Sequence, residues 1–206
     1  MKHTLWVFGD SFCNHYTEKI SKLDIVQWPW LVSNTMYTDV KNFGLGGNSN
    51  YCILQSILTN LPNIKPSDYI VIGTTDCTRV HEVTDSNEVR AYSAEKKILE
   101  DNPHFAGHWK PRPSREPMDS FVLDELLPHA QVYTKWWDEA FDGLKSHLQQ
   151  NGYKVILFGM DMWPKFESIY DSTKGKVMDL HWSKKGHQDF AKFICKEFKI
   201  VNKQLL

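Results

Sequence analysis

A serine at the end of a predicted buried strand is the first residue of this chain that could do chemistry. The apolar run Leu5–Phe8 stops at Gly9-Asp10-Ser11, and this pattern predicts a strand followed by a turn that presents the serine hydroxyl. In open α/β sheets, ligands bind at the carboxyl ends of the strands. A serine is an effective nucleophile only when a base takes its proton and donors stabilise the oxyanion. A hydrolytic site therefore needs a histidine, an orienting acid and oxyanion donors elsewhere in the chain.

Three further segments supply residues of these types. In chain order they are Asn42-Phe43-Gly44-Leu45-Gly46-Gly47-Asn48, Gly73-Thr74-Thr75-Asp76 and Asp179-Leu180-His181-Trp182-Ser183-Lys184-Lys185-Gly186-His187. Together with Gly9-Asp10-Ser11, they resemble the motifs of the SGNH hydrolase superfamily, the GDSL-type lipases and esterases. The resemblance implies a three-layer α/β/α flavodoxin-like fold with a central parallel sheet, and hydrolysis of acyl esters without a metal or an organic cofactor.

The resemblance also implies a role for each matching residue. Ser11 is the nucleophile, and its own backbone N–H is one oxyanion donor. Gly47 supplies a second backbone N–H, which suits glycine because no side chain then blocks the substrate oxygen. His181 is the base, since His181-x-Ser183-x-x-Gly186-His187 precedes an amphipathic segment as in the family.

The third motif departs from the family form, which is Gly-x-Asn-Asp. Thr75 stands where the family has the asparagine that donates a side-chain N–H to the oxyanion. A threonine hydroxyl can donate a hydrogen bond but is shorter than an asparagine side chain. Thr75 is therefore one candidate oxyanion donor, and Asn48 or Asn50 is the alternative.

The fourth motif departs as well. The family acid lies three residues before the histidine, where this chain has Met178, and the nearest acid is Asp179. Two arrangements follow. Either Asp179 orients the ring of His181, or a backbone carbonyl does so and leaves a Ser–His dyad.

Apolar periodicity with glycine and proline stops predicts alternating strands and helices. The predicted strands are Leu5–Phe8, Asp39–Phe43, Asp68–Ile72 and Tyr153–Phe158. The predicted helices are Trp28–Met36, Ile53–Leu61, Leu123–Gln150, a short one near Phe166–Tyr170, and Ser183–Phe198. This order indicates a parallel sheet covered on both faces.

A single domain spanning residues 1–206 fits the length and the ordinary composition, 41% hydrophobic and 24% charged. An irregular insertion is expected at about 84–120, where the sequence is polar and includes Pro111, Pro113 and Pro117. Such a segment is either a loop that overhangs the site or a solvated surface loop.

The charge and cysteine patterns exclude several classes of function. A formal net charge of −1 gives no broad attraction to nucleic acid or to an anionic membrane. No apolar run is long enough to span a bilayer, and we expect no signal peptide because the first predicted strand begins within a few residues of Met1. The four cysteines lack metal-ligand spacing. We therefore expect free thiols, no metal and a cytoplasmic protein; a product released by cell lysis would show the same pattern.

Several other residues admit two interpretations. Four tryptophans could line a sugar-binding or apolar surface, although packing in the core is the default expectation for each; they are Trp28, Trp30, Trp109 and Trp163. His104 and His108 have metal-ligand spacing, but Pro103 and Gly107 argue against a helix there. His187 is expected to pack or to cap the last helix.

These patterns predict a serine esterase whose partner is a small-molecule or carbohydrate ester, including O-acetyl groups on carbohydrate. Two rival interpretations stay open. An acyltransferase would use the same acyl-enzyme on Ser11 with an alcohol in place of water. A non-catalytic module would only bind a glycan or an acyl ligand, and the altered third and fourth motifs would then reflect lost chemistry.

Overall fold

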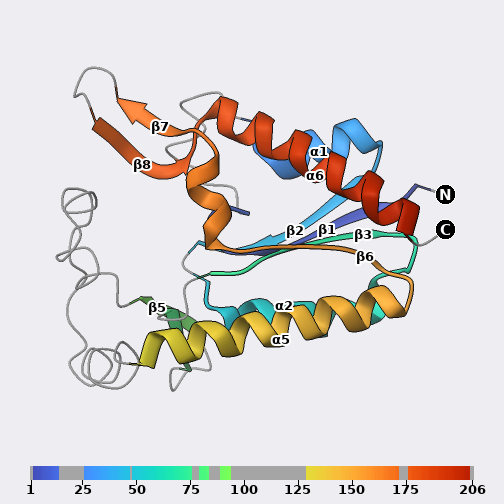
Figure 1. The fold of residues 1–206 in the computed structure, drawn as a ribbon, viewed down its shortest axis with the longest axis horizontal. Coiled ribbons are helices and arrows are strands. Elements are labelled where there is room, and N and C mark those ends of the chain that lie inside the picture. The colour runs from blue at the N-terminus through green and yellow to red at the C-terminus, as the bar shows by residue number, and fades with distance from the viewer. Residues whose placement is uncertain are drawn as a thin grey trace.

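The computed structural model describes residues 2–13, 26–46, 48–75, 79–83, 89–93, 129–171 and 176–204. Its central sheet has four parallel strands in the order β2-β1-β3-β6 (Figure 1). The strands are β1 (Thr4–Gly9), β2 (Asp39–Gly44), β3 (Tyr69–Gly73) and β6 (Lys154–Phe158). The prediction of an α/β fold with a central parallel sheet is confirmed.

Helices cover both faces of this sheet. Helices α1 (Trp28–Met36) and α6 (Lys184–Gln204) lie on one face, and α2 (Asn50–Asn60) and α5 (Ala130–Gln150) lie on the other. A 3₁₀ turn, Leu61–Asn63, ends the α2 segment at Pro62, as expected. Within the described ranges, none of the helices combines the length and the hydropathy that crossing a bilayer requires.

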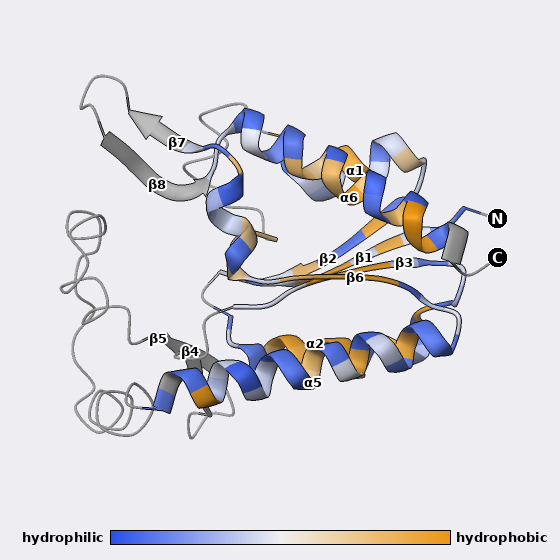
Figure 2. Ribbon diagram, in the orientation of Figure 1, coloured by the Kyte–Doolittle hydropathy of each residue, from blue (hydrophilic) through white to orange (hydrophobic). Residues whose placement is uncertain are grey.

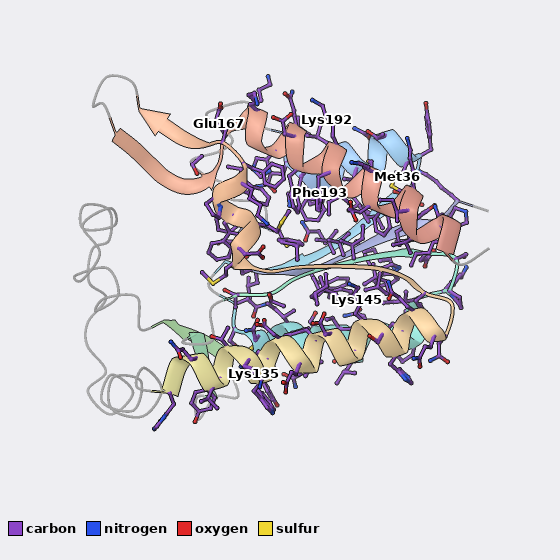
Figure 3. All side chains as sticks on the ribbon, in the orientation of Figure 1. Met36, Lys135, Lys145, Glu167, Lys192 and Phe193 are labelled. Atoms are coloured by element: carbon purple, nitrogen blue, oxygen red, sulfur yellow. The ribbon has the colours of Figure 1, made fainter. Side chains whose placement is uncertain are left out.

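The strands divide their side chains between two cores because successive strand residues point to opposite faces. In β1, Leu5 and Val7 join the core beneath α1 and α6, whereas Trp6 and Phe8 join the core above α2 and α5. Both faces of the strand are therefore apolar, and the sheet runs as a hydrophobic layer between the helices (Figure 2). Side chains fill both interfaces, with Met36 and Phe193 packed against the first core (Figure 3).

Two further strand pairs lie outside the central sheet. Strands β4 (Arg79–Val83) and β5 (Val89–Ser93) form an antiparallel pair, as do β7 (Ser168–Asp171) and β8 (Lys176–Trp182). The expectation of an irregular segment throughout 84–120 was therefore wrong at β5, because pairing with β4 orders that stretch. The rest of that segment lies outside the described residues.

The short helix expected near Phe166–Tyr170 was also wrong. A 3₁₀ helix occupies Met160–Lys165, and residues 168–171 form β7. Phe166, Ile169 and Tyr170 have helical spacing, but pairing with β8 provides hydrogen-bond partners that a single turn of helix would lack.

Asp68 ties together the amino-terminal ends of β1 and β3. Its side chain is only 4% exposed and accepts hydrogen bonds from the Thr4 backbone N–H (3.0 Å), the Trp6 indole (3.0 Å) and the Lys65 backbone N–H (3.2 Å). Burial alone would raise its pKa, but these hydrogen bonds outweigh burial, and the pKa of Asp68 lies below its ordinary value.

Asp68→Ala is expected to lower the free energy of unfolding at pH 7 by about 3 kcal/mol, because three donors lose a charged acceptor. A depressed native pKa means that the unfolded state binds more protons. The contribution of Asp68 is therefore complete above about pH 4, the usual aspartate pKa, and is lost as pH falls through the native pKa. Urea unfolding between pH 3 and pH 7 measures both effects.

The matched control is Asp39→Ala, which removes an exposed carboxylate paired with Lys2 at 2.6 Å. Such surface pairs contribute about 0–1 kcal/mol. Equal losses for Asp68→Ala and Asp39→Ala would contradict the role assigned to Asp68.

Candidate functional site

Ser11 lies on a tight turn directly after β1. The Cys13 backbone N–H donates to the Asp10 carbonyl (3.0 Å), and the Phe12 backbone N–H donates to the Asp10 carboxylate (3.0 Å). Asp10 is 1% exposed and Ser11 8%. The side chain of Asp10 therefore fixes the backbone that presents Ser11, at the carboxyl end of the strand as predicted.

This turn adjoins the point where the sheet order reverses. The chain leaves β1 through α1 on one face, and it enters the neighbouring strand β3 from α2 on the other face. In open α/β sheets, ligands bind at such a switch point, outside the carboxyl ends of the strands. Thr74 and Thr75 follow β3 at this edge, so the first and third motifs meet there.

Direct hydrogen bonds join Thr75 to its neighbours. The Thr75 hydroxyl donates to the Asp10 carboxylate (3.1 Å). The Asn50 side chain makes two bonds to the Thr75 backbone, accepting from its N–H (2.9 Å) and donating to its carbonyl (2.8 Å). Asn48 donates its side-chain N–H to the Gly9 carbonyl (3.2 Å). The residues proposed as alternative oxyanion donors are therefore all buried around the Ser11 turn.

Cys13 fills the space beneath this turn. Its side chain is fully buried and packs so closely that a Cβ at Gly9 would collide with its sulfur, while a Cβ at Gly73 would lie 3.0 Å from it. Burial, and then the charge of Asp10, raise the pKa of the Cys13 thiol well above its ordinary value. The thiol is thus neutral. Cys13, Cys52 and Cys195 are free, as expected, and Cys77 lies outside the described residues.

An aromatic cluster joins the serine segment to the histidine segment. The ring of Phe12 stacks on Trp163 (centroids 4.1 Å apart) and meets Trp182 edge-on (5.1 Å). The Trp182 indole donates to the Trp163 carbonyl (2.9 Å). Phe12 follows Ser11 and Trp182 follows His181, so the first and fourth motifs lie side by side.

The structure describes three of the four tryptophans considered for a ligand surface. Trp28 is fully buried and donates its indole N–H to the Phe12 carbonyl (2.8 Å), so its ring packs in the core, as the default expectation had it, and is not available to line a ligand surface. Trp163 packs on Phe12, and Trp30 is half-buried in α1. Trp109 lies outside the described residues.

Asp179 and His181 both belong to β8. Ile169 of β7 pairs with Asp179, but the preceding residue, Ser168, pairs with Trp182. Leu180 and His181 therefore face no partner on β7 and form a bulge. Bulges occur often beside active sites, where they redirect a side chain. The structure describes the backbone of Asp179 and His181 here, and their roles in the site remain predictions.

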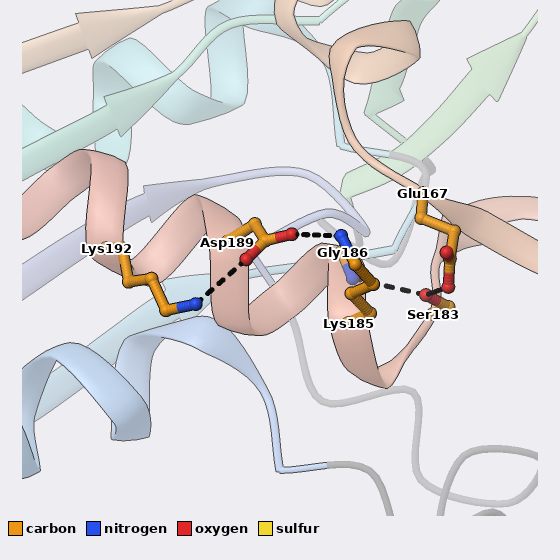
Figure 4. A network of polar contacts seen from close by, with 6 residues as sticks. All are labelled: Glu167, Ser183, Lys185, Gly186, Asp189 and Lys192. Carbon is orange, nitrogen blue, oxygen red and sulfur yellow. Dashed lines mark hydrogen bonds and ion pairs between the residues drawn. The ribbon is translucent and has the colours of Figure 1, made fainter.

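The residues after His181 anchor the start of α6. The Ser183 backbone N–H donates to the Glu167 carbonyl (2.7 Å), its hydroxyl donates to the Glu167 carboxylate (2.6 Å), and the Gly186 N–H donates to that hydroxyl (3.1 Å) (Figure 4). A Cβ at Gly186 would collide with the Glu167 carbonyl. The glycine of the fourth motif thus lets the helix start approach the backbone at Glu167.

His187 packs inside this corner, as expected. It is 3% exposed, and its Nδ1 accepts the Trp28 backbone N–H (3.4 Å). Three other residues singled out in the sequence, which are Gly47, His104 and His108, lie outside the described residues. Among the side chains that the structure describes, no group of three His, Cys, Asp or Glu residues is arranged to hold a metal ion.

A pocket of about 300 Å³ lies beside the candidate site, between α5 and the carboxyl end of β6. Its lining residues are Thr74, Asp138, Phe141, Asp142, Leu157, Phe158, Gly159 and Asp161. Desolvation, followed by the charges of Asp142 and Asp161, raises the pKa of Asp138 above its ordinary value. Thr74 links the pocket to the third motif, but Ser11 does not line it, so the pocket is not the centre of the candidate site.

Comparisons with known proteins gave structural matches only. No protein-family model and no curated protein sequence matches the chain. The chain is similar to a member of the lipolytic protein G-D-S-L family from Veillonella parvula (13% identity, 97% of each chain, TM-score 0.40). It is also similar to a lipase/acylhydrolase from Enterococcus faecalis (15% identity, 98% of this chain and 96% of the other, TM-score 0.40). A carbohydrate esterase matches at 11% identity over 96% of this chain and 68% of its own, with a TM-score of 0.38.

Proposed function

We propose that the chain is a serine esterase that hydrolyses acyl esters through an acyl-enzyme on Ser11. The observation that supports this most directly is the ring contact between Phe12 and Trp182 (5.1 Å). This contact joins the turn that presents Ser11 to the segment that contains His181, although the two come from opposite ends of the sequence. The switch point of the sheet, where ligands bind in this class of fold, supports the same assignment.

The proposed reaction has two halves. His181 takes the hydroxyl proton of Ser11 while the serine oxygen bonds to the ester carbonyl carbon, and the carbonyl electron pair moves onto the oxygen. The tetrahedral intermediate then collapses, and the leaving alkoxide receives the proton from the imidazolium. Water, deprotonated by His181, attacks the acyl-enzyme in the same way and releases the acid with Ser11 restored.

Donors around the Ser11 turn would stabilise the oxyanion. The backbone N–H of Ser11 would be one of them, and the side chain of Thr75, Asn48 or Asn50 would be another. Gly47, which lies outside the described residues, would add its backbone N–H if the resemblance to the family holds. Asp179 would orient the ring of His181, or a backbone carbonyl would do so in a dyad. The substrates would be small-molecule or carbohydrate esters, including O-acetyl groups. Acyl transfer to an alcohol would use the same intermediate.

The proposal is tested by labelling the full-length protein with a fluorophosphonate, which reacts with activated serines, and mapping the adduct by mass spectrometry. We expect a single adduct on the peptide that contains Ser11, no adduct in Ser11→Ala, and none after heat denaturation. Product analysis with p-nitrophenyl acetate and longer acyl esters, with and without an added alcohol, then separates hydrolysis from acyl transfer.

An unlabelled wild-type protein with no ester turnover would overturn the esterase proposal in favour of a binding module. An adduct that persists in Ser11→Ala would place the reactive group elsewhere.

A further inference from the structure

We propose that Thr75 serves this site as a positioning residue and does not itself donate to the oxyanion: its hydroxyl holds Asp10, and Asp10 holds the turn that presents Ser11. This inference rests on the proposed function. It concerns the position at which the chain departs from the family form, where threonine replaces the asparagine of the third motif.

The Thr75 hydroxyl donates its hydrogen bond to Asp10. The hydroxyl lies 3.1 Å from the Asp10 carboxylate. An ionised carboxylate accepts hydrogen bonds and has none to give, whereas a hydroxyl has one hydrogen. The hydrogen of Thr75 is therefore directed to Asp10, and no second hydrogen remains for a substrate oxygen. Both residues are buried, Asp10 at 1% and Thr75 at 5% exposure, so water competes little for this bond.

The two carboxylate oxygens of Asp10 accept hydrogen bonds from different donors. One carboxylate oxygen accepts the Thr75 hydroxyl, and the other accepts the Phe12 backbone N–H at 3.0 Å. The Asp10 carbonyl also accepts the Cys13 N–H. The side chain of Asp10 thus bonds across Ser11, which lies between Asp10 and Phe12 in the chain. A shift of the Asp10 carboxylate would be transmitted directly to the backbone on both sides of the nucleophile.

The backbone of Thr75 is in turn held by the first residue of helix α2. Asn50 is the first residue of α2, and its side chain bonds both the N–H and the carbonyl of Thr75, at 2.9 and 2.8 Å. Ser49 caps the same helix by accepting the Cys52 N–H (3.3 Å). A continuous set of hydrogen bonds therefore runs from the start of α2 through Thr75 and Asp10 to the turn. Pre-organisation of this kind places a nucleophile accurately without touching the substrate.

A double-mutant cycle of the full-length protein tests the inference. Thr75→Val removes the hydroxyl and keeps the shape of the side chain. Asp10→Asn leaves one side-chain oxygen for the two hydrogen bonds that the carboxylate accepts. Each is expected to lower kcat by about 10- to 100-fold with little change in KM, the cost of a buried bond to a charged group. The double variant should lose no more than the worse single variant, because both act through one contact. Thr75→Ser should restore most of the rate.

The matched control is Thr35→Val, which removes an exposed hydroxyl that donates to the Leu31 carbonyl (2.8 Å). It should leave kcat and KM unchanged. Additive losses in the cycle would overturn the inference, because they would mean that Thr75 acts on the substrate independently of Asp10.

Amide hydrogen exchange at Phe12 and Cys13 is the readout that does not depend on catalysis. Thr75→Val should speed exchange at both positions, while Thr75→Ser and Thr35→Val should not. If the wild-type protein hydrolyses no ester, the proposed function fails but the exchange data still decide whether Thr75 positions the turn. If hydrolysis is found and Thr75→Val changes neither exchange nor kcat, the positioning role is wrong and the esterase proposal stands.

Discussion

Ser11→Ala is expected to lower kcat for ester hydrolysis by roughly 10⁴- to 10⁶-fold, because the proposed acyl-enzyme forms on the Ser11 oxygen. His181→Ala should lose a similar factor. The double variant should be no worse than either single one, since the two residues act as a unit. Initial rates with p-nitrophenyl acetate, measured from pH 5 to pH 9 in the full-length protein, give these values directly.

Asp179→Asn decides between the two arrangements left open around His181. If Asp179 orients the imidazole, its loss should cost up to about 10⁴-fold, since the amide stabilises the wrong tautomer. If a backbone carbonyl orients the ring instead, the rate should hardly change. The expected order of losses is therefore Ser11 and His181 first, followed by Asp179.

Ser56→Ala in α2 is the matched control, because it removes a half-buried serine hydroxyl at a distance from the switch point. Its activity should equal that of the wild type. If Ser11→Ala and Ser56→Ala both retain the wild-type rate, Ser11 is not the nucleophile and the proposed mechanism fails.

Gly186→Ala is expected to damage both stability and activity. An added Cβ would collide with the Glu167 carbonyl, which is backbone and cannot rotate away. The start of α6 would have to move, at a cost of about 3 kcal/mol, the upper end of overpacking penalties. Because Ser183 ties this helix start to Glu167 and follows Trp182, the displacement should reach His181 and lower kcat by about 10²-fold.

Gly143→Ala provides an unusually direct control. Gly143 lies within α5, and a Cβ there would meet no atom within 4 Å. Alanine is the better helix former by about 1 kcal/mol, so this variant should be slightly more stable than the wild type. Thermal unfolding and ester hydrolysis of both variants make the comparison. A Gly186→Ala protein as stable as Gly143→Ala would show that the close approach to Glu167 is dispensable.

The fold was predictable where local pattern and long-range packing agree. Apolar runs ending in glycine, such as Leu5–Phe8 before Gly9, predicted the central strands within one or two residues. The prediction failed at Phe166–Tyr170, where helical spacing was overridden by pairing with β8. The prediction also failed at Val89–Ser93, because a five-residue strand in a polar segment depends on pairing with its partner, β4.

The candidate site was predictable in its positions but not in its contacts. The sequence predicted that Ser11 and Thr75 each follow a strand, and the structure shows that these strands are neighbours and that both residues lie at the switch point. It did not reveal that Asp10 would accept the Thr75 hydroxyl, or that Asn50 would hold the Thr75 backbone. Those bonds depend on side-chain rotamers across the gap between β1 and β3, for which no residue spacing is diagnostic. The roles of Gly47, Asp179 and His181 stay predictions.

The order of the elements along the chain predicts that the two cores of the sheet close at different times during synthesis. Strand β1 and its Ser11 turn leave the ribosome early, and helices α2 and α5 follow to cover the face of Trp6 and Phe8. The opposite face, with Leu5 and Val7, needs Phe190 and Ile194 of α6, which come later in the chain than every residue of the core above α2 and α5. We expect a nascent chain that lacks α6 to have one finished core and one incompletely covered core, and an exposed apolar face of this kind favours aggregation or chaperone binding. Docking of α6 would complete that core, and Trp182, two residues before the helix, packs against Phe12 beside Ser11 in the finished structure.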